Sequence, residues 1–274
     1  MGIRGGVPKR LPNWRDRAFY DYTVSLTRRG WAWEFLRRNP EFRKAGRALK
    51  PSLVSIDSPG PAFKAVSLFK TLHSLEDWGV FYCDDLEKTA QEATVFWQPE
   101  DCPLVISVEA REIPSRISGR CFSLRGLRCR TTIVRGPAGN EHALLFDRGR
   151  SIQLLWRGAS ITKDRLLVTA EIDITTERAA PQLKTARRFR SLARFGELRP
   201  GLFPPTERAD RLRLVLQALD GSLAGARYRD IAAHIFGVGA EDWADPRRHA
   251  KDRARHAVRR GRAIMEGRYR DFLR

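Results

Sequence analysis

The residues best suited to chemistry are cations between residues 247 and 262. Five of them recur about one helical turn apart and would share one face of a helix: Arg247, Lys251, Arg255, Arg259 and Arg262. From Pro246 to the end of the sequence there are eleven Arg or Lys residues against three Asp or Glu. Guanidinium groups bind phosphate, and the edge of guanine, in a bidentate manner. This face is therefore predicted to bind a polyanion, with duplex DNA as the first candidate.

The same stretch has the features of a helix that packs on a neighbour. Asp245 followed by Pro246 is a typical helix start, because the carboxylate can cap the first turn and proline lacks a donor that would need a partner. Small or apolar residues recur at three- and four-residue spacing on another face: Ala250, Ala254, Ala257, Val258, Gly261, Ile264 and Met265. We therefore predict a helix with one packed face and one cationic face.

Two further helices are predicted just before this basic helix. Thr206 can cap the first, which carries Leu212, Val215, Leu216 and Leu219 and ends at the Asp220–Gly221 turn. The second carries Tyr228, Ile231, Ala232 and Ile235 and is closed by Gly237. Three helices in this order are typical of a helix-turn-helix domain, whose last helix lies in the major groove of DNA.

The residues predicted to bind DNA are Arg227, Arg229, Arg247, Arg248, Lys251, Arg255, Arg259 and Arg262. The alternative is a solvated basic face that binds anions without sequence preference.

The charge of the chain is large and unevenly distributed. The formal net charge is +19, and 42 of the 51 Lys and Arg residues are arginine. The net charge is +9 in residues 1–50, −2 in residues 71–178 and +11 in residues 181–274. The two ends are therefore predicted to face a polyanion and the middle to be an ordinary globular domain. Arginine dominance favours phosphate recognition, although a GC-rich genome gives the same bias.

Aromatic residues are concentrated near the N-terminus, where two short helices are predicted. The partner-binding candidates among them are Trp14, Tyr22, Trp31, Trp33 and Phe35. These side chains can form a small core that packs on the rest of the protein. Alternatively, they can form a surface for a protein partner or for stacking of nucleic-acid bases.

The predicted fold class is α+β, because the hydrophobic period changes to two after about residue 81. Short β-rich runs occur at residues 94–97, 104–108, 131–134, 143–146, 152–156 and 166–170, with hairpin signals at 136–140 and 147–150. We expect a small antiparallel sheet. The predicted organisation is a helical segment at 1–50, a linker and connecting segment at 51–80, an antiparallel β domain at 81–180, a connecting helix and Pro-rich link at 181–206, and the helix-turn-helix domain at 207–274. Gly196 is expected to end the connecting helix.

No motif in the sequence predicts an enzyme. A Gly-rich phosphate loop with its lysine, His-Glu-x-x-His, Gly-x-Ser-x-Gly and the dinucleotide-binding glycine pattern are all missing. The four cysteines have no paired spacing and are expected to be buried thiols, so no metal and no cofactor are expected. Acidic pairs such as Asp84–Asp85 are more typical of solvated surface than of the metal site of a nuclease.

The sequence also lacks the signals of a membrane or secreted protein. No apolar run reaches the ~18–20 residues of a membrane span, and the first residues lack the apolar stretch of a signal peptide. We therefore expect a cytoplasmic, nucleoid-associated protein with no membrane partner.

Several stretches resemble a known bacterial family. The run Gly-Trp-Ala-Trp-Glu-Phe-Leu-Arg-Arg-Asn-Pro at residues 30–40, with Trp14 and Tyr22, resembles the N-terminal transcriptional regulator-like domain of proteins encoded on integrative and conjugative elements. Leu-Phe-Pro-Pro at 202–205, Leu-Gln-Ala-Leu-Asp-Gly at 216–221 and Tyr-Arg-Asp-Phe-Leu at 269–273 resemble the C-terminal DNA-binding-type domain of the same proteins.

This resemblance implies a transcription regulator of conjugative-transfer genes. Some relatives activate transcription, and others that share only the C-terminal part act as antiactivators by binding an activator. Double-stranded DNA is thus the expected partner, with a second copy of the chain, another regulator or RNA polymerase as further candidates. The first alternative is an antiactivator that binds a regulator instead of DNA, and the second is an accessory nuclease of the transfer machinery.

Overall fold

The computed structural model of the 274-residue chain describes residues 13–47, 63–67, 73–116, 121–136, 141–239, 241, 243 and 249–274. The chain forms two compact units. The first, the helical unit, consists of the chain up to Leu26 together with Pro205–Tyr269. The second, the sheet unit, consists of Thr27–Pro204 and Arg270–Arg274. Neither unit is therefore one continuous stretch of sequence.

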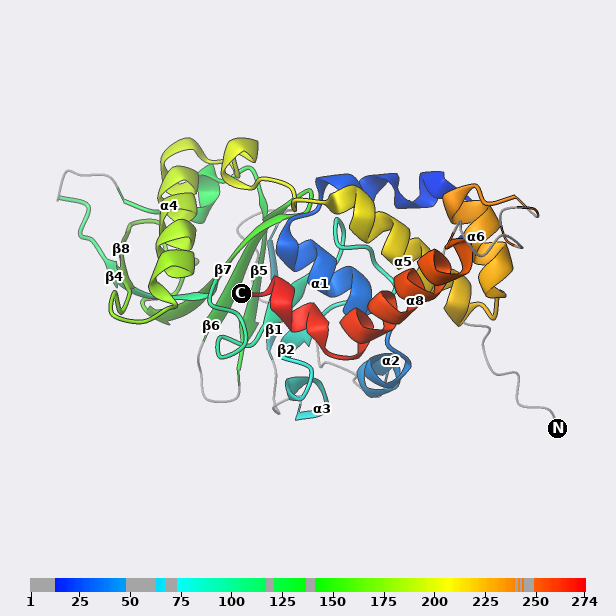
Figure 1. Ribbon diagram of the computed structural model, residues 1–274. Coiled ribbons are helices and arrows are strands. Elements are labelled where there is room, and N and C mark those ends of the chain that lie inside the picture. The colour runs from blue at the N-terminus through cyan, green and yellow to red at the C-terminus, as the bar shows by residue number, and fades with distance from the viewer. Residues whose placement is uncertain are drawn as a thin grey trace. The chain divides into compact units, whose positions relative to one another are not determined.

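The sheet unit is built on a six-stranded mixed sheet (Figure 1). Its strands are β1 (Phe63–Ser67), β4 (Ile106–Glu112), β5 (Arg130–Arg135), β6 (Glu141–Asp147), β7 (Arg150–Gly158) and β8 (Leu166–Glu171). They lie in the order β1-β5-β6-β7-β4-β8. The strands β2 (Val80–Cys83) and β3 (Val95–Trp97) form a separate antiparallel pair.

The expected α+β class is confirmed, but the prediction of a small antiparallel sheet is wrong in size and in strand direction. Strand β1 lies outside the segment predicted to form strands, and the pairs β1–β5 and β4–β7 are parallel. Parallel pairing joins segments that are distant in sequence, which period-two alternation does not reveal. The hairpin predicted at 147–150 is confirmed, because Arg148 and Gly149 both have the positive φ that a type I′ turn requires.

Successive residues of the strands pack into two different cores. On β5, Ile133 lies in a cluster with Phe189 of helix α4 (Ala179–Phe195). The next residue, Val134, lies in a cluster with Tyr82 of β2. Because side chains alternate along a strand, α4 covers one face of the sheet and the β2–β3 pair covers the other. Helix α4 ends at Gly196 with φ 73°, as predicted.

The remaining helices of the sheet unit are α1 (Arg28–Leu36), α2 (Pro40–Arg47) and α3 (His73–Glu76), with short 3₁₀ helices η2 (Leu124–Gly126) and η3 (Pro200–Leu202). Helix α1 is buried on every side from Arg29 to Leu36. A helix buried all round must satisfy its polar side chains inside the protein. The following contacts show how α1 does so.

Gln153 of β7 connects α1 to the strands and is fully buried. Its Oε1 accepts hydrogen bonds from Nη2 of Arg29 at 2.9 Å and from the backbone N–H of Trp97 at 3.0 Å. Its Nε2 donates to the carbonyl of Trp97 at 2.7 Å. One side chain therefore joins α1, β3 and β7.

Glu34 provides the second buried polar anchor of α1. Its carboxylate accepts hydrogen bonds from Nε of Arg37 and Nη1 of Arg38, both at 2.7 Å. The backbone N–H of Ala90 donates to the other oxygen at 2.7 Å. The charge of Glu34 is thus matched by two buried guanidinium groups.

The helical unit contains the 3₁₀ helix η1 (Arg17–Ser25) and the helices α5 (Ala209–Leu223), α6 (Tyr228–Phe236) and α8 (Ala250–Glu266), which is followed by η5 (Arg268–Phe272). Buried polar contacts attach the N-terminal segment to α5. The hydroxyl of Tyr20 donates to Oδ2 of Asp220 at 2.7 Å. Nε2 of Gln217 donates to the carbonyl of Trp14 at 2.7 Å.

Several helix boundaries differ from those predicted. Thr206 does not cap α5, since the residue before the helix is Arg208 in a left-handed conformation. Helix α5 also continues through Asp220 and Gly221 to Leu223, because Gly221 packs closely against the ring of Trp14 instead of forming a turn. Gly237 ends α6 as predicted. The predicted helix start at Asp245–Pro246 lies outside the described residues.

We predict that Glu34→Gln destabilises the sheet unit by about 3–5 kcal/mol, because it removes the carboxylate that two buried guanidinium groups face. Burial raises the pKa of Glu34, but the charges of Arg37 and Arg38 and the N–H of Ala90 outweigh burial and lower this pKa to about 2. The folded pKa lies below the unfolded value of about 4.3. The stabilisation is therefore present above pH ~4 and is lost as the pH falls toward 2.

Denaturant unfolding of both proteins between pH 6 and pH 2 measures this effect. The wild type should lose more stability than Glu34→Gln over that range, and Glu41→Gln, at an exposed position on α2, should behave as the wild type. Identical pH dependence of the wild type and Glu34→Gln would contradict the assignment.

Candidate nucleic-acid interface

Helix α8 has one buried and one cationic face, as the sequence predicts. Ala254, Ala257, Val258, Gly261, Ile264 and Met265 are buried. Four of the predicted DNA-binding residues are exposed on this helix: Lys251, Arg255, Arg259 and Arg262. We call these four the α8 stripe. They lie within about 80° of one another around the helix axis at 100° per residue, so one ligand surface can contact them all.

Close packing on α5 fixes the direction of the stripe. A Cβ atom at Gly261 would lie 2.9 Å from Cβ of Leu219 and 3.1 Å from the carbonyl oxygen of Val215. The two helix backbones therefore approach each other at a distance that only glycine permits at this position. Because α8 also contacts α6, its rotation about its own axis is set by the core.

The α8 stripe borders a surface hollow of about 850 Å³ that also includes the start of α6. The hollow is lined by Tyr228, Asp252, Arg255, His256, Val258, Arg259, Arg262, Ala263 and Glu266. Tyr228, one of the four residues predicted to line this helix, is 44% exposed. It is the first residue of α6. The hollow thus combines one aromatic ring with three arginines.

The cations of the stripe are only weakly neutralised within the described residues. Nη1 of Arg255 lies 4.0 Å from Oδ1 of Asp252, and both side chains are exposed, so this pair contributes little. Nη2 of Arg262 donates to Oγ of Ser222 at 3.0 Å, which orients Arg262 without removing its charge. Lys251 and Arg259 form no ion pair with a carboxylate of the described residues.

Arg227 and Arg229 flank Tyr228, and both are exposed. Arg227 is the N-cap residue of α6, and its side chain makes no capping hydrogen bond. The helix dipole favours an anion at this end of α6, where Asp230 already supplies one carboxylate in the first turn. Arg227 and Arg229 therefore flank the one residue of α6, Tyr228, that lines the same hollow as Arg255, Arg259 and Arg262.

The connections between the three helices are unequal in length. Helices α5 and α6 are joined by residues 224–227, including Gly225 with φ 79°. Residues 237–249 separate α6 from α8 in the sequence, and residues 240, 242 and 244–248 of this stretch lie outside the described residues. Arg247 and Arg248, predicted to bind DNA, lie in this connection and outside the described residues.

The aromatic partner-binding candidates are mostly core side chains. Trp14 is buried in the helical unit, and Trp31, Trp33 and Phe35 are buried in the sheet unit. Only Tyr22 is partly exposed. Burial of the other four argues against a partner surface and agrees with the alternative of a packed core.

A second group of cations lies on the sheet unit. Arg187, Arg190, Arg194 and Arg199 line a hollow of about 470 Å³ together with the exposed ring of Phe195. Partial burial and, next, the charges of Arg188 and Arg28 lower the pKa of the neighbouring Lys184. The surface around α4 is therefore also positive, although the DNA-binding prediction did not include it.

The described residues contain no group of three or more His, Cys, Asp or Glu side chains that could hold a metal ion. Their four cysteines are free thiols. Among the same residues, no helix combines the length and the apolar character needed to cross a membrane.

Two family models match the chain. Residues 166–274 match a model described as "T6SS, Transcription factor, DNA binding domain". Residues 13–69 match a model described as "Proteobacterial transcriptional regulator-like domain". No curated protein is significantly similar to the chain. The two matches indicate a transcriptional regulator with a DNA-binding domain, and that domain includes the α8 stripe, the start of α6 and α4.

We predict that Gly261→Ala destabilises the helical unit by about 1–3 kcal/mol, because its methyl group forces α8 away from α5. The better helix propensity of alanine offsets this by at most about 1 kcal/mol. Thermal unfolding followed by circular dichroism measures the difference.

Gly267→Ala is the matched control for this change. Gly267 follows the same helix with an extended φ of 177°, and a Cβ there meets no atom within 4 Å. A Gly261→Ala protein as stable as the control would show that the close approach of α5 and α8 is not needed.

Proposed function

We propose that this chain is a transcriptional regulator that binds duplex DNA in a sequence-specific manner through the α8 stripe and the start of α6. The single observation that carries the proposal is the hollow in which Arg255, Arg259 and Arg262 of α8 lie beside the exposed ring of Tyr228 of α6. Lys251, Arg255, Arg259 and Arg262, with Arg227 and Arg229, supply the contacts, and Arg247 and Arg248 extend them. Contacts of this kind to phosphates fix the register of a protein on DNA.

The lengths of the connections suggest which helix enters the major groove and which contacts phosphates. A four-residue connection makes α5 and α6 the pair closest to a helix-turn-helix, with α6 as its second helix. On this view the first turn of α6, with Tyr228 and Arg229, enters the major groove. The α8 stripe then contacts phosphates beside it. In the opposite assignment, which the sequence suggests, α8 enters the major groove and the start of α6 contacts phosphates. The same surface of the protein faces the DNA in both cases.

The genes under control are a separate part of the proposal. The resemblance to regulators of conjugative elements supports transfer genes as targets. The description of the matching DNA-binding model names T6SS, which supports a secretion-system promoter. Binding to DNA places the protein at the nucleoid in the cytoplasm, and two half-sites would require two copies of the chain.

We predict that the double substitution Lys251→Glu and Arg255→Glu lowers affinity for duplex DNA at least about 100-fold, since each lost contact costs about 1–3 kcal/mol and the new carboxylates repel phosphate. Fluorescence anisotropy with a labelled duplex from the upstream region of the gene, against a scrambled duplex, measures this.

The matched control is Arg157→Glu with Lys163→Glu, which makes the same change in net charge at two exposed positions of the sheet unit. The control should bind nearly as the wild type does. For the wild type, about six phosphate contacts give a slope near −5 for log K against log salt. Equal loss in both double variants would mean that only the overall charge matters and would contradict the site.

We predict that Arg229→Ala and Arg255→Ala affect specificity differently. A residue that reads a base edge contributes about 1–3 kcal/mol at one base pair, whereas a phosphate contact weakens binding to all sequences alike. If α6 lies in the major groove, Arg229→Ala reduces the preference for the upstream duplex over the scrambled one, and Arg255→Ala weakens both equally. The reverse result would assign the reading role to α8.

A further inference from the structure

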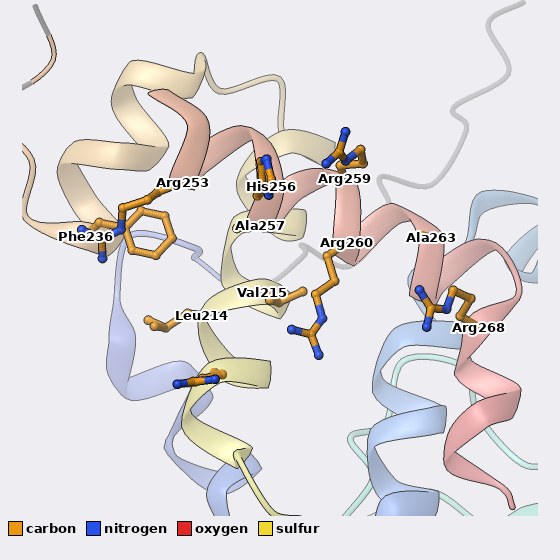
Figure 2. A pocket seen from close by; sticks show the side chains of 11 residues that line it. Leu214, Val215, Phe236, Arg253, His256, Ala257, Arg259, Arg260, Ala263 and Arg268 are labelled. Atoms are coloured by element: carbon orange, nitrogen blue, oxygen red, sulfur yellow. The ribbon is translucent and has the colours of Figure 1, made fainter. Parts of the chain in front are cut away.

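A second hollow, of about 840 Å³, lies on the other flank of α8, between α8, α5 and the end of α6 (Figure 2). Its lining residues are Arg211, Leu214, Val215, Phe236, Arg253, His256, Ala257, Arg259, Arg260, Ala263 and Arg268. We call it the α5–α8 groove. The DNA-binding prediction contains only one of these residues, Arg259.

The floor and the rim of the groove have different chemistry. The floor is formed by apolar side chains from three helices: Leu214, Val215, Phe236, Ala257 and Ala263. The rim is formed by cations, namely Arg211, Arg253, Arg259, Arg260 and Arg268, with His256 beside them. No lining residue is acidic. A concentration of like charge on an apolar floor costs stability, so it favours a ligand that supplies both carboxylates and apolar groups.

The side chains already lie in positions suited to such a ligand. The guanidinium carbon of Arg253 lies 4.8 Å from the centre of the Phe236 ring, and Figure 2 shows Arg260 extending from α8 toward α5. From Arg253 to Ala263, α8 lines about 15 Å of the groove at a rise of about 1.5 Å per residue. This length corresponds to nearly three turns of a helix laid alongside it.

We propose that the α5–α8 groove binds an acidic amphipathic helix of a protein partner. Apolar side chains on one face of that helix fill the floor, and carboxylates on its two flanks pair with the arginines of the rim. Helix-in-groove recognition uses such anchors at three- and four-residue spacing, and opposite charges orient the two surfaces. The occupant is a different protein, because a second copy of this chain, with its net charge of +19, would add to the excess of cations at the rim.

Other ligands fit the groove less well. The DNA backbone would pair with the arginines but would leave Leu214 and Phe236 without apolar contacts. A small organic anion would neutralise one or two cations and would leave the others facing each other. The proposal does not depend on DNA binding by the α8 stripe, because Arg253 and Arg260 lie on the other flank of α8 and Arg211 lies on α5.

The test uses the full chain and a fluorescein-labelled helical peptide of about 18 residues, or five turns. The peptide carries leucines at i, i+3, i+4 and i+7 and glutamates at the flanking positions. A matched peptide has the same glutamates and a serine in place of each leucine. Anisotropy is measured at about 0.15 M salt, where binding by charge alone is screened.

The leucine peptide should bind at least about tenfold more tightly than the serine peptide. Arg211→Glu with Arg260→Glu should lower the affinity for the leucine peptide at least about tenfold. Leu214→Ser should lower the affinity for the leucine peptide toward that for the serine peptide and leave binding of the serine peptide unchanged. Arg157→Glu with Lys163→Glu, at two exposed positions of the sheet unit, makes the same change in net charge and is the matched control, which should alter peptide binding by less than about twofold.

Equal affinity for the two peptides would mean that the groove binds by charge alone, and would overturn the proposal. The same conclusion follows if neither peptide binds, or if Arg211→Glu with Arg260→Glu has no effect. Unchanged duplex affinity in the Lys251→Glu, Arg255→Glu variant, together with loss of duplex binding in Arg211→Glu with Arg260→Glu, would assign the groove to DNA. Circular dichroism of each variant checks that it remains folded.

Discussion

The arrangement of the helical unit depends on one close contact, where α8 lies against α5 at Gly261. A side chain of even one carbon at this position would meet Cβ of Leu219 and the backbone of Val215. Ala254 and Ala257 continue the same small-residue face. Since small side chains allow two helix backbones to approach, they also fix the rotation of α8. The cations of α8 then lie on either side of this contact with α5, in the α8 stripe and in the α5–α8 groove, and Arg259 borders both hollows.

The unit that carries these surfaces is assembled from both ends of the chain. Trp14 and Tyr20 are buried against α5, and their hydrogen bonds to Gln217 and Asp220 join segments about 200 residues apart. Such buried polar pairs are costly to break and specify one arrangement. The family matches cross the boundaries of the two units, because residues 13–69 and 166–274 each contribute to both. The matched regions are therefore not independent structural units, and the N-terminal aromatic residues serve folding.

Local patterns predicted the parts of the structure that depend on local physics. The small-residue face of α8, the helix ends at Gly196 and Gly237 and the hairpin at 147–150 follow from helix spacing and from residues that adopt positive φ. The parallel pairing of β1 with β5 and the burial of Trp31 and Trp33 depend on contacts distant in sequence. The cationic stripe was visible in the spacing of arginines. The groove was not, because Arg253 and Arg260 acquire their role only beside Leu214 of α5 and Phe236 of α6.

Two cationic surfaces on opposite flanks of one helix cannot bind their ligands independently. Arg259, His256 and Ala263 line both hollows, and the remaining cations lie within a few turns of α8. An acidic helix in the groove would bring several carboxylates within about one Debye length, roughly 8–10 Å, of the α8 stripe. Those carboxylates would lower the positive potential that attracts DNA phosphates, and bound DNA would lower the attraction for the acidic helix by the same free energy. If both proposed ligands bind as inferred, an acidic partner would therefore antagonise DNA binding without any change in conformation.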